Sequence, residues 1–75
     1  IPVVTVNRDR LKIIDLLSEN NLVASRKEAK RTVQQGGVYL NDERIQDINT
    51  VVTFSAEAEH ILKIGKKRFY KICKS

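Results

Sequence analysis

The segment from residue 25 to residue 37 most constrains the fold of this chain, because it contains both a helix start and a helix stop. Ser25 and Glu28 have the spacing of a capping box. The serine hydroxyl can accept a hydrogen bond from the third helical N–H, and the glutamate can reach back to the serine N–H. Gly36 and Gly37 supply the backbone freedom with which a helix ends in a left-handed turn. The sequence therefore predicts a short helix within this segment.

The two sides of this predicted helix differ in chemistry. At about 100° per residue, one arc carries long polar side chains, namely those of Arg26, Lys27, Lys30, Arg31 and Gln34. The opposite arc carries small or apolar residues, namely Ala29, Thr32, Val33 and Gly36. We expect the helix to pack by its small side and to present its cations outward. Such a surface is either a phosphate-binding face, helped by the helix N-terminus, or a solvated charged face.

The rest of the chain is predicted to be α+β, with two main helices packed on a small, mostly antiparallel sheet. Asn7 is a plausible N-cap for a first helix over residues 8–19, which Asn20 and Asn21 would end. After Gly37 the hydrophobic period changes to two. This change predicts a hairpin of residues 38–40 and 43–46 about Asn41 and Asp42, a strand at 51–54, and a second hairpin of residues 61–64 and 68–73.

Two segments remain open at this level. Residues 1–6 are expected to be extended and form either a short edge strand or a tether. Residues 7–75 are expected to make one domain. Residues 55–59 form either a loop or one helical turn. The 75 residues include 41% hydrophobic and 31% charged residues, enough for a globular fold with a small core. The chain begins with Ile1, so we expect a piece of a longer protein or a processed mature protein.

Composition argues against several classes of function. No apolar run approaches the roughly 20 residues of a membrane span, so no membrane partner is expected. The single cysteine, Cys73, cannot form an internal disulfide, and with the lone His60 it cannot supply metal-ligand spacing. We therefore expect a reducing, cytoplasmic location and no metal or cofactor. No paired catalytic carboxylates, Ser–His–Asp pattern or Gly-rich phosphate loop is present, so the chain alone is not expected to be an enzyme.

Net charge points instead to a polyanion partner. The chain carries +5, of which residues 26–46 contribute +2 and residues 61–75 contribute +6, while residues 47–60 contribute −3. This uneven distribution predicts one positive face. Besides the helix cations, the second predicted hairpin brings a cluster of Lys66, Lys67 and Arg68, which either binds phosphate or is a solvated turn. Arg44 either reaches phosphate or pairs with Glu43.

Aromatic residues are few. Phe54, Phe69 and Tyr70 are expected in the core, whereas Tyr39 alternates with core residues and is either a stacking platform or core. This scarcity argues against a module that stacks single strands and favours recognition of folded RNA through shape and phosphates.

The chain resembles the RNA-binding module named after the fourth protein of the small ribosomal subunit. The resemblance rests on the pattern Ser25, Arg26, Glu28, Ala29, Arg31, Val33, Gly36, Val38, Leu40 and Asn41. The later segment of residues 61–70 is similar to the end of this module in the C-terminal domain of bacterial tyrosyl-tRNA synthetases. Asp42 departs from the glycine common after that asparagine.

The resemblance implies a function. In that family the domain is appended to a dimeric class I catalytic body and grips tyrosine tRNA at the anticodon arm and the long variable arm. The RNA-binding residues implied here are Arg26, Lys27, Lys30, Arg31, Asn41, Lys66, Lys67 and Arg68. The domain itself is expected to be monomeric, and any enzyme activity would belong to the parent, an ATP-dependent tyrosine–tRNA ligase. Two alternatives remain: the same module in a ribosomal, ribosome-rescue or pseudouridine-synthase protein, and a basic protein-interaction domain.

Overall fold

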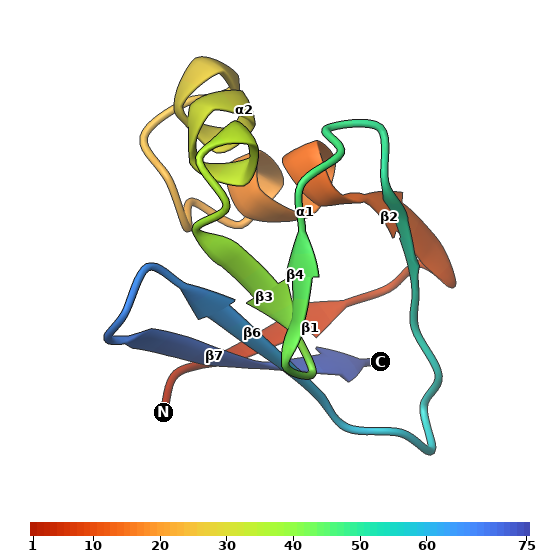
Figure 1. The fold of residues 1–75 in the computed structure, drawn as a ribbon. Helices are drawn as coiled ribbons and strands as arrows, with labels where there is room; N and C mark the ends of the chain where they lie inside the picture. The colour runs from red at the N-terminus through yellow and green to blue at the C-terminus, as the bar shows by residue number, and fades with distance from the viewer.

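A computed structural model describes all residues, 1–75, and contains two helices and seven strands. Along the chain they are β1 (Val3–Val6), β2 (Arg10–Lys12), α1 (Ile13–Glu19), α2 (Arg26–Gln34), β3 (Val38–Leu40), β4 (Glu43–Ile45), β5 (Val51–Thr53), β6 (His60–Ile64) and β7 (Arg68–Lys74) (Figure 1). The predicted α+β class and both predicted hairpins are confirmed. Neither helix is long and apolar enough to cross a lipid bilayer.

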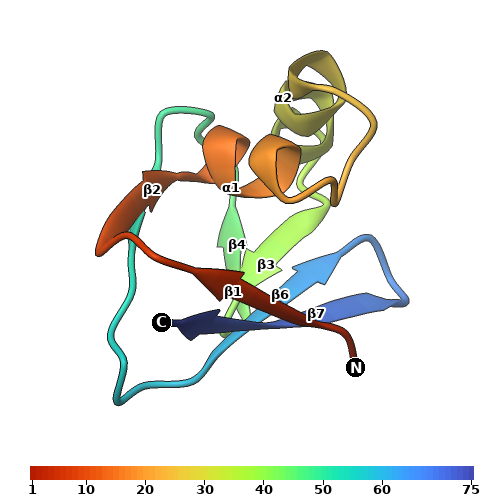
Figure 2. The ribbon, with the colours of Figure 1, turned by 180° about the vertical axis from the view of Figure 1, so that it is seen from behind.

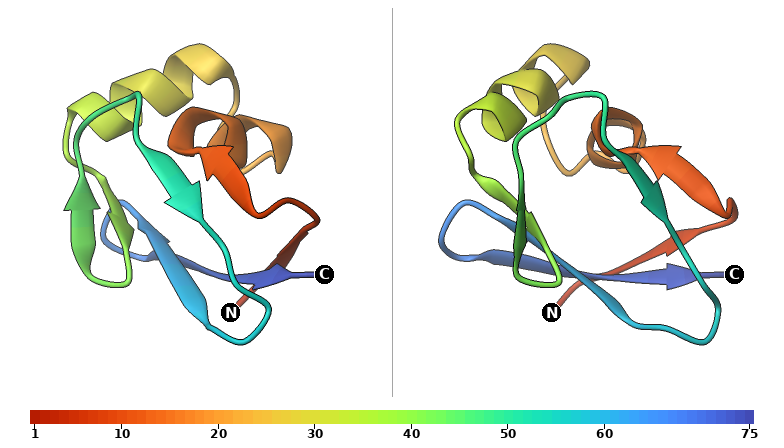
Figure 3. Two further views of the ribbon diagram at one scale, coloured as in Figure 1. Left: turned by 90° about the vertical axis from the view of Figure 1, so that its right-hand side faces the viewer. Right: turned by 45° about the vertical axis from the view of Figure 1, so that its right-hand side comes forward.

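The strands form two sheets. The larger has five strands in the order β1-β7-β6-β3-β4, and only its β1–β7 pair is parallel. The smaller pairs β2 with β5 in antiparallel fashion. Both helices lie over one face of the five-stranded sheet, and no helix or strand covers the opposite face (Figures 2 and 3). We call this uncovered side the outer sheet face.

The core fills the space between the helices and the inner face of the sheet. It contains 16 buried hydrophobic residues, of which Ile13, Leu16, Leu17, Val33, Val38, Leu62 and Ile72 are fully shielded from solvent. Burial of this apolar surface is the main stabilising contribution in so small a domain. The helices supply one side of this core and the alternate residues of β3, β6 and β7 supply the other.

The first helix is shorter than predicted, and the assignment of residues 8–12 to it is wrong. The helix begins at Ile13, with Lys12 rather than Asn7 in the N-cap position and without a side-chain cap. Residues 10–12 instead form β2, in which Leu11 is buried opposite Val52 of β5. Strand pairing thus prevails over helix propensity here, because only the extended form buries Leu11 against β5.

The segments left open now have a defined structure. Residues 3–6 form an edge strand that pairs with β7. Residues 55–59 form turns and loop rather than a helix. Asn41 and Asp42 both have positive φ, 50° and 70°, as the two central residues of a type I′ hairpin turn require.

Among the aromatic residues, the expectation of burial is confirmed for Phe54 and wrong for Phe69. Phe54 is 3% exposed, whereas Phe69 is 40% exposed. The reason is strand alternation. Tyr70 and Ile72 turn toward the core, so Phe69 points to the outer sheet face.

Candidate nucleic-acid interface

The helix α2 is fixed by its cap, its end and its small buried side. The Ser25 Oγ accepts a hydrogen bond from the Glu28 N–H at 3.2 Å, which confirms half of the capping box. The Glu28 carboxylate lies 3.9 Å from the Arg31 guanidinium rather than bonding back to Ser25. Gly36 ends the helix with φ of +73°. Ala29 and Val33 are fully buried, so the opposite, cationic side of the helix faces solvent.

The four cations of α2 divide into two arginines with carboxylate partners and two lysines without. Arg26 forms an ion pair with Asp15 of α1, and Arg31 approaches Glu28. Lys27 and Lys30 are exposed and have no ion-pair partner. The lysines therefore carry the available positive charge of this helix. The partner of Arg26 could not be found from the sequence, because Asp15 reaches it only through the packing of α1 on α2.

The turn between β6 and β7 supplies the second cationic cluster. Lys66 and Lys67 are exposed and unpaired, and Gly65 takes the positive φ that the turn requires, +70°. The Gly65 N–H donates to the Gly37 carbonyl at 2.7 Å, so the turn lies against the end of α2. In Figure 1 both elements lie on the left of the molecule. Two pairs of unpaired lysines therefore occupy adjoining elements, and we call them the lysine cluster: Lys27, Lys30, Lys66 and Lys67.

Arg68 forms hydrogen bonds within the fold. Its Nη2 donates to the Leu22 carbonyl and to the Tyr70 hydroxyl, each at 2.6 Å, and its Nε donates to the same hydroxyl at 3.0 Å. These bonds join the loop before α2 to β7. The guanidinium is thereby engaged within the fold, whereas the two lysines that precede it have no ion-pair partner.

Replacement of Arg68 by alanine tests this role. Loss of a charge-assisted bond to a partly buried carbonyl should lower the free energy of unfolding by about 1–3 kcal/mol. The RNA affinity of the folded variant should fall only by the small amount expected when one distant positive charge is lost. Urea unfolding followed by circular dichroism gives the first quantity and filter binding the second. A large loss of affinity with unchanged stability would restore Arg68 to the binding residues.

Asn41 is also engaged within the fold. Its Oδ1 accepts from the Ile61 N–H at 2.9 Å, while its own N–H donates to the Ile61 carbonyl. This pair of bonds ties the β3–β4 turn to β6. Arg44, beyond the turn, donates to the Tyr39 hydroxyl at 2.8 and 3.1 Å and does not pair with Glu43.

Two further lysines are partly neutralised by neighbouring carboxylates. A hydrogen bond from Lys74 holds the pKa of Asp9 below its usual range. A hydrogen bond to Glu59, at 3.1 Å, raises the pKa of Lys71. These ammonium groups therefore contribute less to the attraction of a polyanion than the lysine cluster does.

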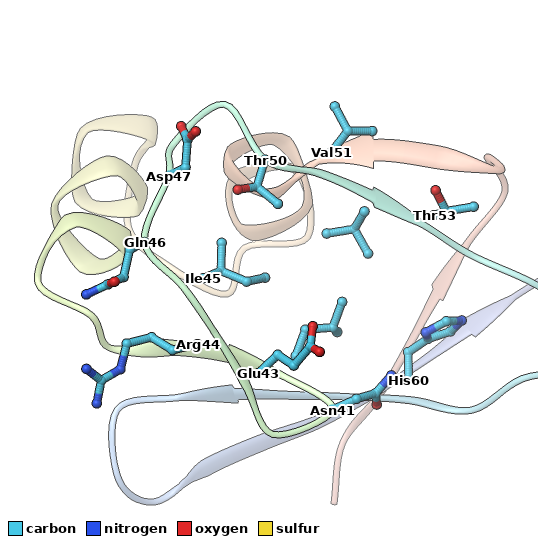
Figure 4. Close-up of a pocket in the computed structure, with 12 residues that line it drawn as sticks. Asn41, Glu43, Arg44, Ile45, Gln46, Asp47, Thr50, Val51, Thr53 and His60 are labelled. Carbon is cyan, nitrogen blue, oxygen red and sulfur yellow. The ribbon is translucent and has the colours of Figure 1, made fainter.

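A pocket of about 570 Å³ opens between β4 and β5 (Figure 4). Glu43 and Asp47 contribute carboxylates to its lining, which oppose the approach of phosphate. His60 also lines it. This ring is 8% exposed, stacks edge-on against Phe54 and accepts from the Ser55 N–H at 3.4 Å through Nε2. No group of three or more His, Cys, Asp or Glu side chains is arranged to hold a metal ion. The pocket and the lysine cluster are therefore separate features.

Comparison with known proteins gives one consistent family. A family model described as the tyrosine–tRNA ligase SYY-like C-terminal domain matches residues 1–72. The tyrosine–tRNA ligase of Thermotoga maritima is 45% identical over 71 residues, and that of Aquifex aeolicus is 37% identical over 71 residues. Each alignment covers 95% of this chain but only 17% and 18% of the respective ligase.

A solved structure supports the same fold. The solution structure of a tyrosyl-tRNA synthetase C-terminal domain superposes with a TM-score of 0.77 and 25% sequence identity. The match covers the whole of this chain and 79% of that domain.

Proposed function

Because this chain belongs to the C-terminal domain family of tyrosine–tRNA ligases, we propose that it binds tRNA on behalf of the catalytic part of such an enzyme. The observation that carries this proposal is the lysine cluster. Four exposed ammonium groups without carboxylate partners lie on α2 and on the turn that bonds to its C-terminal end. The partner that suits such a surface is a polyanion whose phosphates follow a curved path, as in folded tRNA.

In the proposed mechanism, lysine ammonium groups displace the counterions of the RNA backbone. The free N–H groups at the start of α2 add partial positive charge toward the same ligand. Arg26 and Arg31 remain candidate phosphate contacts, but each must exchange an internal carboxylate for the phosphate. The binding free energy therefore comes mainly from the lysines, with Asn41 and Arg68 holding the two hairpins in place.

The finer assignments follow the family. We propose that the ligand is tyrosine tRNA, held at its anticodon arm and long variable arm, and that the domain is monomeric within a homodimeric parent enzyme in the cytoplasm. Adenylate formation and aminoacyl transfer would belong to the catalytic part of the parent. This chain would raise the affinity for the tRNA by adding a second, linked contact.

Filter binding of the 75-residue chain to three RNAs tests this proposal: tyrosine tRNA, a tRNA with a short variable arm, and a ribosomal RNA fragment. We expect the highest affinity for tyrosine tRNA. Four neutralised phosphates give a slope of log K against log salt of about −3, which is a loss of about two powers of ten between 50 and 200 mM salt.

Other outcomes distinguish the rivals. Equal affinity for all three RNAs would favour a ribosomal or RNA-modifying parent for the module. An absence of salt dependence would remove the electrostatic mechanism. Retention of a protein partner without any RNA binding would favour a protein-interaction domain.

A further inference from the structure

The outer sheet face carries an ordered row of side chains that the lysine cluster does not include. Because successive residues of a strand point to opposite faces, the residues between the buried positions of each strand point outward. They are Val3, Thr5, Tyr39, Arg44, Ile61, Lys63, Phe69, Lys71 and Cys73. This set contains three cations and two aromatic rings and no carboxylate.

Four of these residues lie directly opposite one another across four neighbouring strands. Arg44 of β4 pairs with Tyr39 of β3, Tyr39 with Lys63 of β6, and Lys63 with Phe69 of β7. We call them the cross-strand row. Cations and rings therefore alternate along a line that crosses the sheet.

The contacts within the row hold its side chains in place. The Lys63 Nζ lies 5.2 Å from the centre of the Tyr39 ring and 5.7 Å from that of Phe69. The Arg44 guanidinium lies 5.3 Å from the centre of the Tyr39 ring and donates to its hydroxyl. Neither Arg44 nor Lys63 has an ion-pair partner. Two rings are thus pre-positioned beside two cations whose charge is available to a ligand.

We propose that the cross-strand row is a second RNA contact, on which unpaired bases of the bound RNA stack while Arg44 and Lys63 bind the adjoining phosphates. This inference rests on the proposed function, since it assigns a further part of the same ligand. Aromatic rings flanked by cations on an open sheet suit unpaired nucleotides, because every base has a face that can stack.

The spacing of the row favours unpaired nucleotides over a duplex. Tyr39 and Phe69 stand on strands separated by β6, so their backbones are about 10 Å apart. Bases stacked within a helix cannot reach both rings at once. A strand whose bases are splayed apart can place one on each ring.

The row also adjoins the lysine cluster. A Cβ built at Gly36 would lie 3.4 Å from the Arg44 Cδ, so the Arg44 side chain runs along the end of α2. Gly37 in turn accepts a hydrogen bond from the turn that carries Lys66 and Lys67. The end of α2 therefore lies between the lysine cluster and the row, so one RNA could contact both. A protein partner would find two cations without carboxylate partners on this face, Arg44 and Lys63, because Lys71 is paired with Glu59. Unpaired positive charge makes a polyanion the better complement.

Binding of a single-stranded RNA of about eight nucleotides to the 75-residue chain tests the proposal. The comparison ligand is an abasic strand of the same length, which keeps the phosphates and lacks the bases. Tyr39→Leu and Phe69→Leu should each weaken binding of the base-containing strand on the order of tenfold, with the salt slope unchanged. Binding of the abasic strand should stay the same. Tyr39→Phe keeps the ring and should retain the affinity, and Val51→Ala, at an exposed position of the other sheet, serves as a control for the fold.

Emission of a Phe69→Trp variant provides a direct readout, because the chain contains no other tryptophan. Stacked bases should quench it, and the abasic strand should not. Unchanged affinity of the two leucine variants would overturn the inference while leaving the proposed function intact. Failure of the proposed function would appear separately, as unaltered tRNA affinity when the lysine cluster is removed. If the emission of the Phe69→Trp variant were already that of a buried ring in a full-length ligase without RNA, the outer sheet face would be a protein contact. That result would also overturn the inference.

Discussion

Replacement of all four residues of the lysine cluster by alanine should abolish most of the tRNA affinity while leaving the domain folded. Each phosphate contact contributes nearly one unit to the salt slope, so the magnitude of the slope should fall by about three. At 0.1 M salt this corresponds to an affinity loss of about three powers of ten. The fold should persist because all four side chains are exposed and none makes an ion pair. Filter binding across a salt series measures both quantities.

A matched control distinguishes whether the loss of affinity depends on the position of the removed charges or only on their number. Arg8, Arg10 and Lys12 are also exposed and cationic, but they lie in or beside β2, in the other sheet. Their replacement by alanine should change the slope by less than one, because charges beyond a Debye length are largely screened. If the two sets of substitutions lowered the affinity equally for each charge removed, general electrostatic attraction would replace the proposed interface.

The parts of the fold set by local chemistry were predictable from the sequence. The cap at Ser25, the small buried side at Ala29 and Val33, and the left-handed Gly36 are all found in α2 or directly beside its ends. Each depends on residues within one or two helical turns. The same holds for the turn at Asn41 and Asp42, whose side chains tolerate positive φ.

The parts set by distant pairing were not predictable. Residues 10–12 form a strand only because β5, some forty positions later, pairs with them. Its place beside Lys67 in the sequence predicts that Arg68 binds phosphate, but its guanidinium donates to the Leu22 carbonyl, 46 positions earlier. The sequence can place charges along a chain, but the packing of distant elements decides which of them are already satisfied.

The cross-strand row also depends on the pairing of strands that are distant in the sequence. Because side chains alternate along β6, Lys63 and Leu62 point to opposite faces of the sheet, and this can be predicted from the sequence. That Lys63 lies between Tyr39 and Phe69 requires the strand order β7-β6-β3, because sequence neighbours do not reveal which strands lie side by side. Four aromatic residues in 75 predict no stacking surface. Two of them nevertheless lie on one face, so their number along the chain underestimates their local concentration.

Replacement of Leu62 by alanine should be the most damaging single truncation in the sheet. Leu62 is fully buried and pairs with Leu40 of β3 and Tyr70 of β7, at the middle of the five strands. Loss of a buried leucine costs about 2–5 kcal/mol, whereas a domain of this length is stable by about 4–11 kcal/mol in total. At the middle of both ranges, the midpoint of urea unfolding should therefore fall by about a half, with little change in the m-value.

Replacement of Ile61 by alanine is the matched control, because the two residues are adjacent in β6 and point to opposite faces. Ile61 lies on the outer sheet face, so its truncation creates no cavity and should cost about 1 kcal/mol or less. A larger cost at Ile61 than at Leu62 would mean that the two faces have been assigned the wrong way round. Tyr39, Lys63 and Phe69 would then belong to the core side, and the stacking surface would be lost together with this account of the core.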